Sequence, residues 1–166
     1  MSAPLPDPTR PFSEQGDTLL LAQCIFGEAR GEIEAAQTGV GWVVQNRLLY
    51  HRPEYGDRSY SGVILKPGQF DCFTDEVDQL MNPLKYESDS VWENCFDLAS
   101  GIIGGIVERN IDACTFYHSI PLDQTTKLPY WAKMPLKIEH YCDLGNLHFY
   151  RYREYASSVA EDSMGG

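Results

Sequence analysis

The sequence has no long uninterrupted run of apolar residues. A helix that spans a membrane needs about 18–20 such residues, whereas the longest candidate, residues 98–107, is short and is broken by Gly101, Gly104 and Gly105. We therefore expect no membrane insertion.

Basic residues are also scarce. The 166 residues include 13 Lys and Arg against 24 Asp and Glu, for a formal net charge of −11. A protein that binds the phosphate backbone of a nucleic acid needs clustered Lys and Arg to displace counterions. This balance argues against nucleic acid as a partner.

Paired cysteines are missing as well. The five cysteines are an odd number and include no C-x-x-C pair, which excludes the common zinc knuckles and disulfide scaffolds of small secreted domains. Cys24 and Cys95 fall in apolar helical stripes, where a thiol packs as a small hydrophobe. We expect most of the cysteines to be reduced core residues. One disulfide is the alternative, and the sequence does not identify its two cysteines.

The chain divides into three segments. Residues 1–16 hold Pro4, Pro6, Pro8 and Pro11, which predicts an extended arm that cannot be helical. Residues 17–152 form the single core that a chain of this length supports, and residues 153–166 read as a polar tail.

Hydrophobic spacing predicts a mainly α (α+β) fold with a small β element. Helices are expected at 17–29, with Asp17 as N-cap and Gly31 ending it, at 33–49, and at 89–108, the last as the central buried helix. Gly39 and Gly41 in the second helix indicate close helix packing. Residues 51–86 are expected to be loop-rich with short helices, and residues 114–118 and 147–150 to be short strands.

Glu28 is the residue with the clearest chemical potential. It continues the apolar stripe formed by Leu21, Cys24 and Ile25, and a carboxyl group that loses hydration favours its neutral form. Such a group can act as the general acid in glycosidic cleavage. The alternative is a helix-terminal Glu paired with a nearby arginine, Arg30 or Arg47.

An ordered series of motifs resembles the SleB/CwlJ cell-wall hydrolases, also known as spore-cortex-lytic enzymes. The likeness covers residues 18–151, and a series in fixed order is more specific than any single motif. It runs through Leu21-Ala22-Gln23-Cys24-Ile25-Phe26-Gly27-Glu28-Ala29-Arg30-Gly31-Glu32, Gln37, Gly41-Trp42-Val43-Val44-Gln45-Asn46-Arg47, Gly62-Val63-Ile64, Pro67-Gly68-Gln69-Phe70, Thr115-Phe116-Tyr117-His118, Pro129-Tyr130-Trp131-Ala132, Gly145-Asn146 and Phe149-Tyr150.

The resemblance implies a lysozyme-like helical catalytic domain, here residues 17–152, that cleaves the MurNAc–GlcNAc bond of peptidoglycan without a cofactor. Glu28 matches the acidic residue of the family. Six other residues are implied to bind or support the glycan strand: Glu32, Gln69, Phe70, Tyr117, His118 and Trp131.

The product depends on whether a second carboxylate faces Glu28. A hydrolytic muramidase needs one, as nucleophile or as base, and Glu32, Glu34, Asp71 and Asp75 are the candidates, with Glu32 also able to cap the helix or position the site. A lytic transglycosylase needs Glu28 alone, as acid and then base, and forms a 1,6-anhydro sugar. We expect the transglycosylase.

Three alternatives use other chemistry. A cysteine-dependent amidase or peptidase would activate Cys24 with His118 or His140. A metal hydrolase would use His51, His118, His140 and His148, but these lack a paired motif such as H-E-x-x-H, so no metal site is expected. A non-catalytic wall-binding protein would stack Tyr117, Tyr130 and Trp131 on sugar.

The expected place of action is the cell wall. Residues 1–8 lack the basic and apolar regions of a secretory signal, and no repeated wall-binding module is seen. These features suggest a stand-alone lytic unit, a phage endolysin or virion-associated lysin that acts in the periplasm or outside the cell, with a virion or assembly partner.

Overall fold

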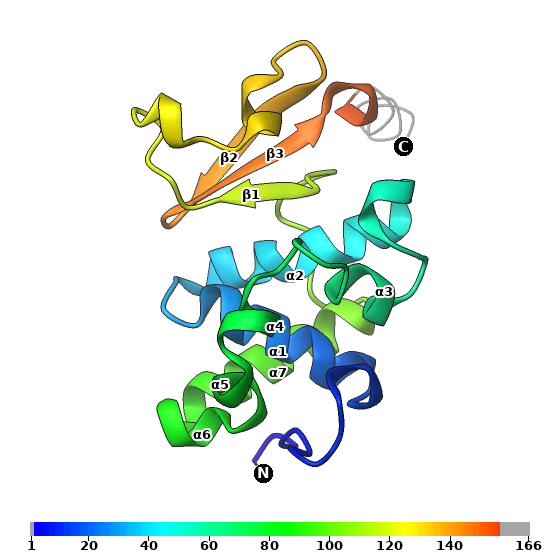
Figure 1. Ribbon diagram of the computed structural model, residues 1–166, viewed down its shortest axis with the longest axis vertical. Helices are drawn as coiled ribbons and strands as arrows, with labels where there is room; N and C mark the ends of the chain where they lie inside the picture. Colours follow the sequence, from blue (N-terminus) through cyan, green and yellow to red (C-terminus); the bar gives the residue numbers. More distant parts are fainter. Residues whose placement is uncertain (1, 157–166) are drawn as a thin grey trace.

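The computed structural model describes residues 2–156. A layer of helices carries a small three-stranded antiparallel sheet on one side (Figure 1), which confirms the predicted fold class. The helices are α1 (Asp17–Ala29), α2 (Glu34–Leu49), α3 (Tyr60–Ile64), α4 (Cys72–Asp75), α5 (Val77–Met81), α6 (Pro83–Tyr86) and α7 (Asp89–Ile103). The strands are β1 (Phe116–His118), β2 (Ile138–Leu144) and β3 (Leu147–Tyr152), and the 3-10 turns are η1 (Phe12–Glu14), η2 (Pro53–Tyr55), η3 (Thr125–Lys127) and η4 (Tyr130–Lys133).

The centre of the helical layer is α1, not the helix predicted at 89–108. Every side chain from Leu20 to Phe26 is buried, and α1 packs on both α2 and α7. By contrast, α7 buries only one face. A helix that is apolar all round belongs inside a core, whereas a one-sided stripe covers its surface.

The helix at α7 also ends earlier than predicted, at Ile103 instead of residue 108. Gly105 takes a positive φ of 76°, and the amides of Ile106 and Val107 fold back onto the carbonyl of Gly101, at 2.8 and 3.0 Å. This is the glycine-terminated helix end that satisfies the last carbonyls. Ile106 is 82% exposed as a result.

Helix α2 lies directly between α1 and the sheet (Figure 1). A Cβ on Gly39 would stand 2.6 Å from the ring of Phe149 in β3, and one on Gly41 would stand 2.4 Å from Ile102 in α7. Both distances are far below van der Waals contact, so the prediction of close packing at these glycines is confirmed.

The sheet order is β1-β3-β2. The strands predicted at 114–118 and 147–150 are present, shorter in the first case and longer in the second, but β2 was not predicted. Its register shifts between His140 and Cys142, so Tyr141 is an extra, bulged residue. The bulge breaks the period-two alternation by which a strand is recognised.

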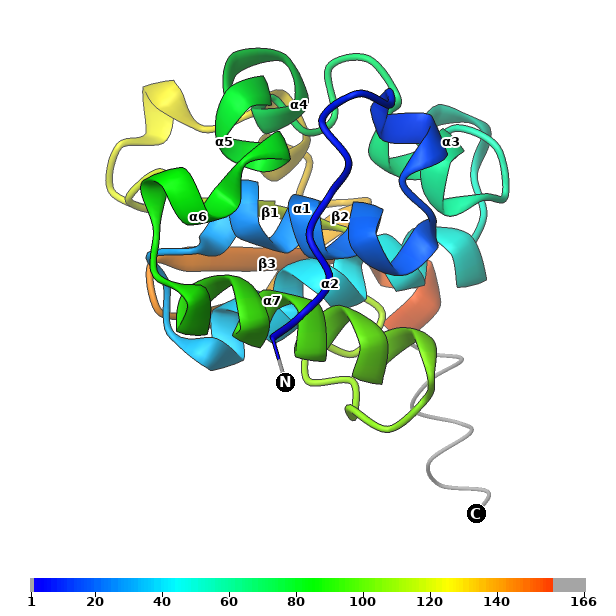
Figure 2. The same cartoon turned by 90° about the horizontal axis from the view of Figure 1, so that it is seen from below.

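The proline-rich segment runs across α1 and the first half of α7 (Figure 2). The indole of Trp92 in α7 donates a hydrogen bond to the carbonyl of Pro4 at 2.9 Å. The prediction that this segment holds no helix is wrong at η1, where Pro11 stands just before the first helical residue and its missing N–H costs nothing. Similarly, Gly16, not Asp17, is the N-cap of α1.

The fold also tests the prediction about the cysteines. All five cysteines are free, and four of them are buried, which confirms the expectation of reduced core residues. No helix within residues 2–156 is long and apolar enough to cross a membrane. Most of the predicted tail, residues 157–166, lies outside the described residues.

Candidate active site

Glu28 lies in the last turn of α1, with Arg30 as the C-cap. Its carboxylate accepts a hydrogen bond from the Tyr117 hydroxyl of β1 and another from the Cys72 thiol of α4. The nearby arginines are engaged elsewhere: Arg30 pairs with Glu76 at 2.6 Å, and Arg47 donates to the carbonyl of Thr115 at 2.9 Å. No ion pair reaches Glu28 from residues 2–156, so the alternative of a helix-terminal salt bridge is not supported.

The environment of Glu28 raises its pKa above the ordinary value. Burial is the largest cause, and the charges of Asp71 and Glu76 add to it, while the hydrogen bonds from Tyr117 and Cys72 act in the opposite direction. A carboxylate at the C-terminal end of a helix also faces the negative end of the helix dipole. Glu28 therefore keeps its proton at a pH at which an exposed glutamate has lost it.

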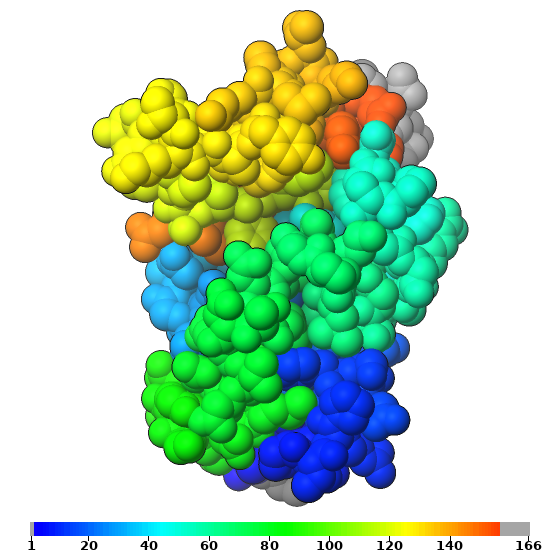
Figure 3. Space-filling model, viewed as in Figure 1, coloured from blue at the N-terminus to red at the C-terminus, as the bar shows by residue number. Residues whose placement is uncertain are grey.

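Glu28 opens into a cavity of about 510 Å³ between the helical layer and the sheet. Figure 3 shows this face of the molecule hollowed between the sheet segments above and the helical segments below. The cavity is lined by Glu28, Arg47, Arg52, Glu54, Tyr55, Gly68, Gln69, Phe70, Phe116, Tyr117, Tyr130, Trp131, Met134, Lys137, Ile138 and Tyr152.

Arg47 holds one wall of the cavity in place. Its guanidinium is buried and lies over the rings of Tyr55 and Phe70, at 5.2 and 5.3 Å, and it donates to the side-chain oxygen of Gln69 at 3.0 Å. A guanidinium between aromatic faces is stabilised by cation–π attraction. Arg47 therefore fixes the orientation of Gln69 at the cavity surface.

The end of α1 is fixed by Gln37 of α2. Its side-chain amide donates to the carbonyl of Ala29 at 3.1 Å, and its oxygen accepts from Asn94 of α7 at 2.8 Å. The last carbonyls of a helix have no partner within the helix. The Ala29 carbonyl also accepts from the amide of Glu32 at 2.9 Å, so Gln37 adds a second bond that ties the end of α1 to α2 and α7.

Five of the seven predicted site residues line this cavity: Glu28, Gln69, Phe70, Tyr117 and Trp131. The other two do not. The carboxylate of Glu32 lies 3.4 Å from the backbone amide of Asn146, at the turn between β2 and β3. His118 follows Tyr117 in β1, and since successive side chains of a strand point to opposite faces, it shares the outer face with Phe116, but it is buried and does not line the cavity.

His118 contacts the cavity wall from behind. Its ring lies 5.8 Å from that of Trp131, its Nε2 is 3.0 Å from the Tyr150 hydroxyl, and its Nδ1 accepts from the amide of Ile120 at 3.1 Å. This arrangement makes His118 a support for Trp131.

The cavity contains one carboxylate, Glu54, that sequence reasoning missed. Glu54 lies in η2, within the segment that carries no family motif, so the sequence held no signal for it. Its carboxylate accepts from Arg52 at 2.8 Å and from the Tyr152 hydroxyl at 3.3 Å. The four carboxylates predicted as second acids, Glu32, Glu34, Asp71 and Asp75, are not among the lining residues.

The thiols offer no nucleophile. Cys24 is fully buried, and burial raises its pKa well above the ordinary value. Burial does the same for Cys72. A reactive cysteine needs an exposed, stabilised thiolate, so the structure argues against the amidase alternative built on Cys24.

Two solved structures share this fold. The structure is similar to the catalytic domain of the germination-specific lytic transglycosylase SleB from Bacillus anthracis, with 20% identity over 82% of this chain and 94% of that one and a TM-score of 0.59. It is also similar to the catalytic domain of the Bacillus cereus SleB protein, with 22% identity over 80% and 88% of the two chains and a TM-score of 0.53. Both likenesses show a shared fold.

Comparison with curated proteins gives no match. The family model described as Cell Wall Hydrolase matches residues 31–150, beginning just after Glu28 and spanning most of the chain. On this match, the chain belongs to the cell wall hydrolase family.

Proposed function

We propose that the protein is a peptidoglycan lytic transglycosylase that cleaves the β-1,4 bond between MurNAc and GlcNAc, with Glu28 as its single acid and base. The observation that carries the proposal is the state of Glu28. It is a largely buried carboxyl group without a cationic partner, with a raised pKa, and it faces a cavity with aromatic walls.

The first step needs a proton donor. Glu28 gives its proton to the glycosidic oxygen as the bond from that oxygen to the anomeric carbon of MurNAc breaks. The acetamido oxygen of the same sugar stabilises the positive charge that develops on this carbon. The Tyr117 hydroxyl, which already donates to Glu28, stabilises the carboxylate that remains.

The second step returns the proton. The C6 hydroxyl of MurNAc bonds to the anomeric carbon, and ionised Glu28 removes the hydroxyl proton. The products are a 1,6-anhydro MurNAc end and a new GlcNAc end, no water is consumed, and Glu28 is protonated again for the next cycle.

The walls of the cavity fit a glycan strand. Trp131 stacks on Phe116 with ring centroids 4.8 Å apart, and Tyr130, which is 79% exposed, extends the same aromatic surface outward. Aromatic faces pack against the apolar faces of sugar rings. Gln69, held by Arg47, supplies an amide for a sugar hydroxyl or an acetamido group.

The test is digestion of purified peptidoglycan followed by mass spectrometry of the muropeptides. We expect anhydro-MurNAc ends from the wild type and no soluble product from Glu28→Gln with an unchanged circular dichroism spectrum. Products with free stem peptides would overturn the glycosidase class, and a Glu28→Gln variant that keeps most of its activity would remove Glu28 from the mechanism.

A hydrolytic muramidase is the second candidate because Glu54 lines the cavity with Glu28. The hydrogen bond from Arg52 is the main cause that lowers the pKa of Glu54, which keeps it ionised and able to activate water. Reducing MurNAc ends, lost in Glu54→Gln, would select this mechanism. Anhydro ends that persist in Glu54→Gln would select the transglycosylase.

Delivery by a phage, as an endolysin or virion-associated lysin, completes the proposal. Expression inside a bacterial host tests it: an endolysin lyses the culture only when a separately induced pore protein permeabilises the inner membrane. Lysis without the pore protein, or none with it, would contradict this role.

A further inference from the structure

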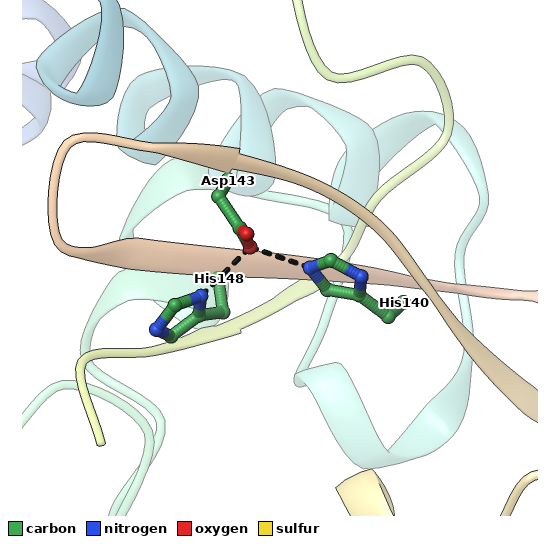
Figure 4. Close-up of side chains that lie close together, drawn as sticks. All are labelled: His140, Asp143 and His148. Atoms are coloured by element: carbon green, nitrogen blue, oxygen red, sulfur yellow. Dashed lines mark hydrogen bonds and ion pairs between the residues drawn. The ribbon is translucent and has the colours of Figure 1, made fainter. Parts of the chain in front are cut away.

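A second cluster of chemically active side chains lies on the outer side of the sheet, away from Glu28. His140 and Asp143 come from β2 and His148 from β3. Figure 4 shows the three side chains pointing toward one another, with the carboxylate of Asp143 between the two imidazole rings. Within residues 2–156, this is the one group of three His, Cys, Asp or Glu side chains whose ligand atoms all lie within 4.8 Å of one another.

The bulge in β2 creates the cluster. His140 pairs with Tyr150, and Asp143 pairs with His148, whereas Cys142 pairs with Phe149 on the inner side. In a regular strand, residues three apart point to opposite faces. The extra residue Tyr141 shifts the alternation by one, so that His140 and Asp143 face the same side. Bulges are often found where a strand must redirect a side chain.

The distances suit a small divalent cation. Oδ1 of Asp143 lies 2.5 Å from Nε2 of His140 and 2.7 Å from Nδ1 of His148. Zn²⁺ binds imidazole and carboxylate at about 2.0–2.2 Å, so an ion among these three atoms requires the two pairs that include Asp143 to open by less than about 1 Å each. Rotation of two exposed side chains supplies this movement.

The donor set selects the class of ion. Two imidazoles and one carboxylate suit Zn²⁺ and its first-row neighbours, whereas Mg²⁺ and Ca²⁺ prefer oxygen ligands throughout. The side chains of His140 and Asp143 are 39% and 44% exposed, so solvent reaches the site and a water can complete the coordination.

The neighbouring histidine is not part of the set. Both ring nitrogens of His118 are already engaged, with Tyr150 and with the amide of Ile120. Its ring instead packs 5.2 Å from that of His148 and supports Trp131 from behind.

We propose that His140, Asp143 and His148 form a three-ligand site for a divalent first-row transition metal ion, represented by Zn²⁺, on the outer face of the sheet. The ion ties β2 to β3 across their hairpin and fixes the surface on which His118 and Trp131 rest. It takes no part in the chemistry of Glu28, and the inference does not rest on the proposed function.

Calorimetric titration of the whole, chelator-treated chain with ZnCl₂ tests the site. We expect one saturable equivalent in the wild type and in Glu28→Gln, and at least a tenfold loss of affinity in His148→Ala and in Asp143→Asn. Two matched controls, His51→Gln and Cys142→Ser, should bind as the wild type does, because His51 lies outside the cluster and Cys142 points to the inner face.

Co²⁺ absorption and thermal unfolding supply readouts that do not depend on activity. We expect visible bands of nitrogen and oxygen ligation in the wild type, absent from the double variant His140→Ala/His148→Ala, and a thermal midpoint that Zn²⁺ raises in the wild type alone. The proposal is overturned if the wild type shows no saturable binding, if the double variant binds as tightly as the wild type, or if Cys142→Ser abolishes binding.

Discussion

Glu28 and Asp143 are two carboxylates on opposite sides of the same sheet, and their pKa values are shifted in opposite directions. Glu28 is buried against the inner face, has no cationic partner, and has a raised pKa caused chiefly by burial. Asp143 stands on the outer face between two imidazoles. Burial acts to raise its pKa too, but the hydrogen bonds and charges of His148 and His140 outweigh it, and the pKa falls below its usual range. The surroundings, more than the carboxyl group itself, decide whether a proton is stored or released.

The largest effect that tests this contrast is the loss of activity in Glu28→Gln. The amide keeps the shape and the hydrogen bond to Tyr117 but cannot transfer a proton, and general acid–base catalysis contributes about 10²–10⁴-fold. We expect lysis of purified peptidoglycan to fall by about 10³-fold or more with the fold intact. Retained activity would mean that the proton of the Glu28 carboxyl group is not transferred during catalysis.

Tyr117→Phe sharpens the contrast on the inner face. Its hydroxyl lowers the pKa of Glu28 by donating to the carboxylate, so its removal raises that pKa further. We expect about tenfold lower activity, in line with the loss of a hydrogen bond to a charged group, and an alkaline limb of the pH profile that moves to higher pH.

The matched control for that variant is Tyr150→Phe. It removes the same hydroxyl from the neighbouring strand, where the partner is His118 and not Glu28. Activity should stay within about twofold of the wild type, and the pH profile should not move. Equal losses in the two variants would show that the inner and outer faces do not differ in function.

The raised pKa of Glu28 should make the free energy of unfolding depend on pH. Its folded pKa lies above the ordinary value of 4.5, so between these two values the folded chain binds more protons than the unfolded chain, and the free energy of unfolding falls as pH rises. Glu28→Gln lacks this dependence. Urea unfolding of both proteins should therefore show the variant gaining stability over the wild type from about pH 4.5 upward, and a constant difference would contradict the raised pKa.

The smallest effect concerns the net charge of −11. The substrate wall is also anionic, and repulsion between like charges slows encounter until salt screens it. We expect the initial rate of wall lysis to rise by about two- to threefold between 10 and 150 mM NaCl, while the rate of cleavage of a short uncharged glycan fragment stays unchanged. A rate that falls with salt would indicate attraction instead.

The sequence allowed the inner face to be predicted far better than the outer one. The apolar stripe in α1 and the ordered motifs pointed to Glu28, Gln69, Phe70, Tyr117 and Trp131, because helical periodicity and local motifs are short-range signals. His118 and Glu32 were predicted in the same groove but lie outside the cavity lining, since a motif lists neighbours in sequence and does not say which face of a strand each one takes.

The outer cluster was not recognised as a site: His140 and His148 were considered as ligands of a metal hydrolase, but Asp143 was not placed with them. The sequence shows His140 and Asp143 three residues apart, a spacing that a regular strand would split between two faces. A bulge, which hydrophobic pattern does not predict, reverses that conclusion. Glu54 was missed because it lies in a loop whose path depends on packing of Tyr55, which is buried, under Arg47.

The position just before Glu28 has a consequence for anyone who modifies this protein. A Cβ at Gly27 would stand 2.6 Å from the sulfur of Cys72 and 2.8 Å from Leu80, so α4 and α5 rest on bare backbone there. A mutant library aimed at the residues around Glu28 should leave position 27 unvaried and place its diversity at exposed rim residues such as Tyr130, where new side chains have room in the solvent.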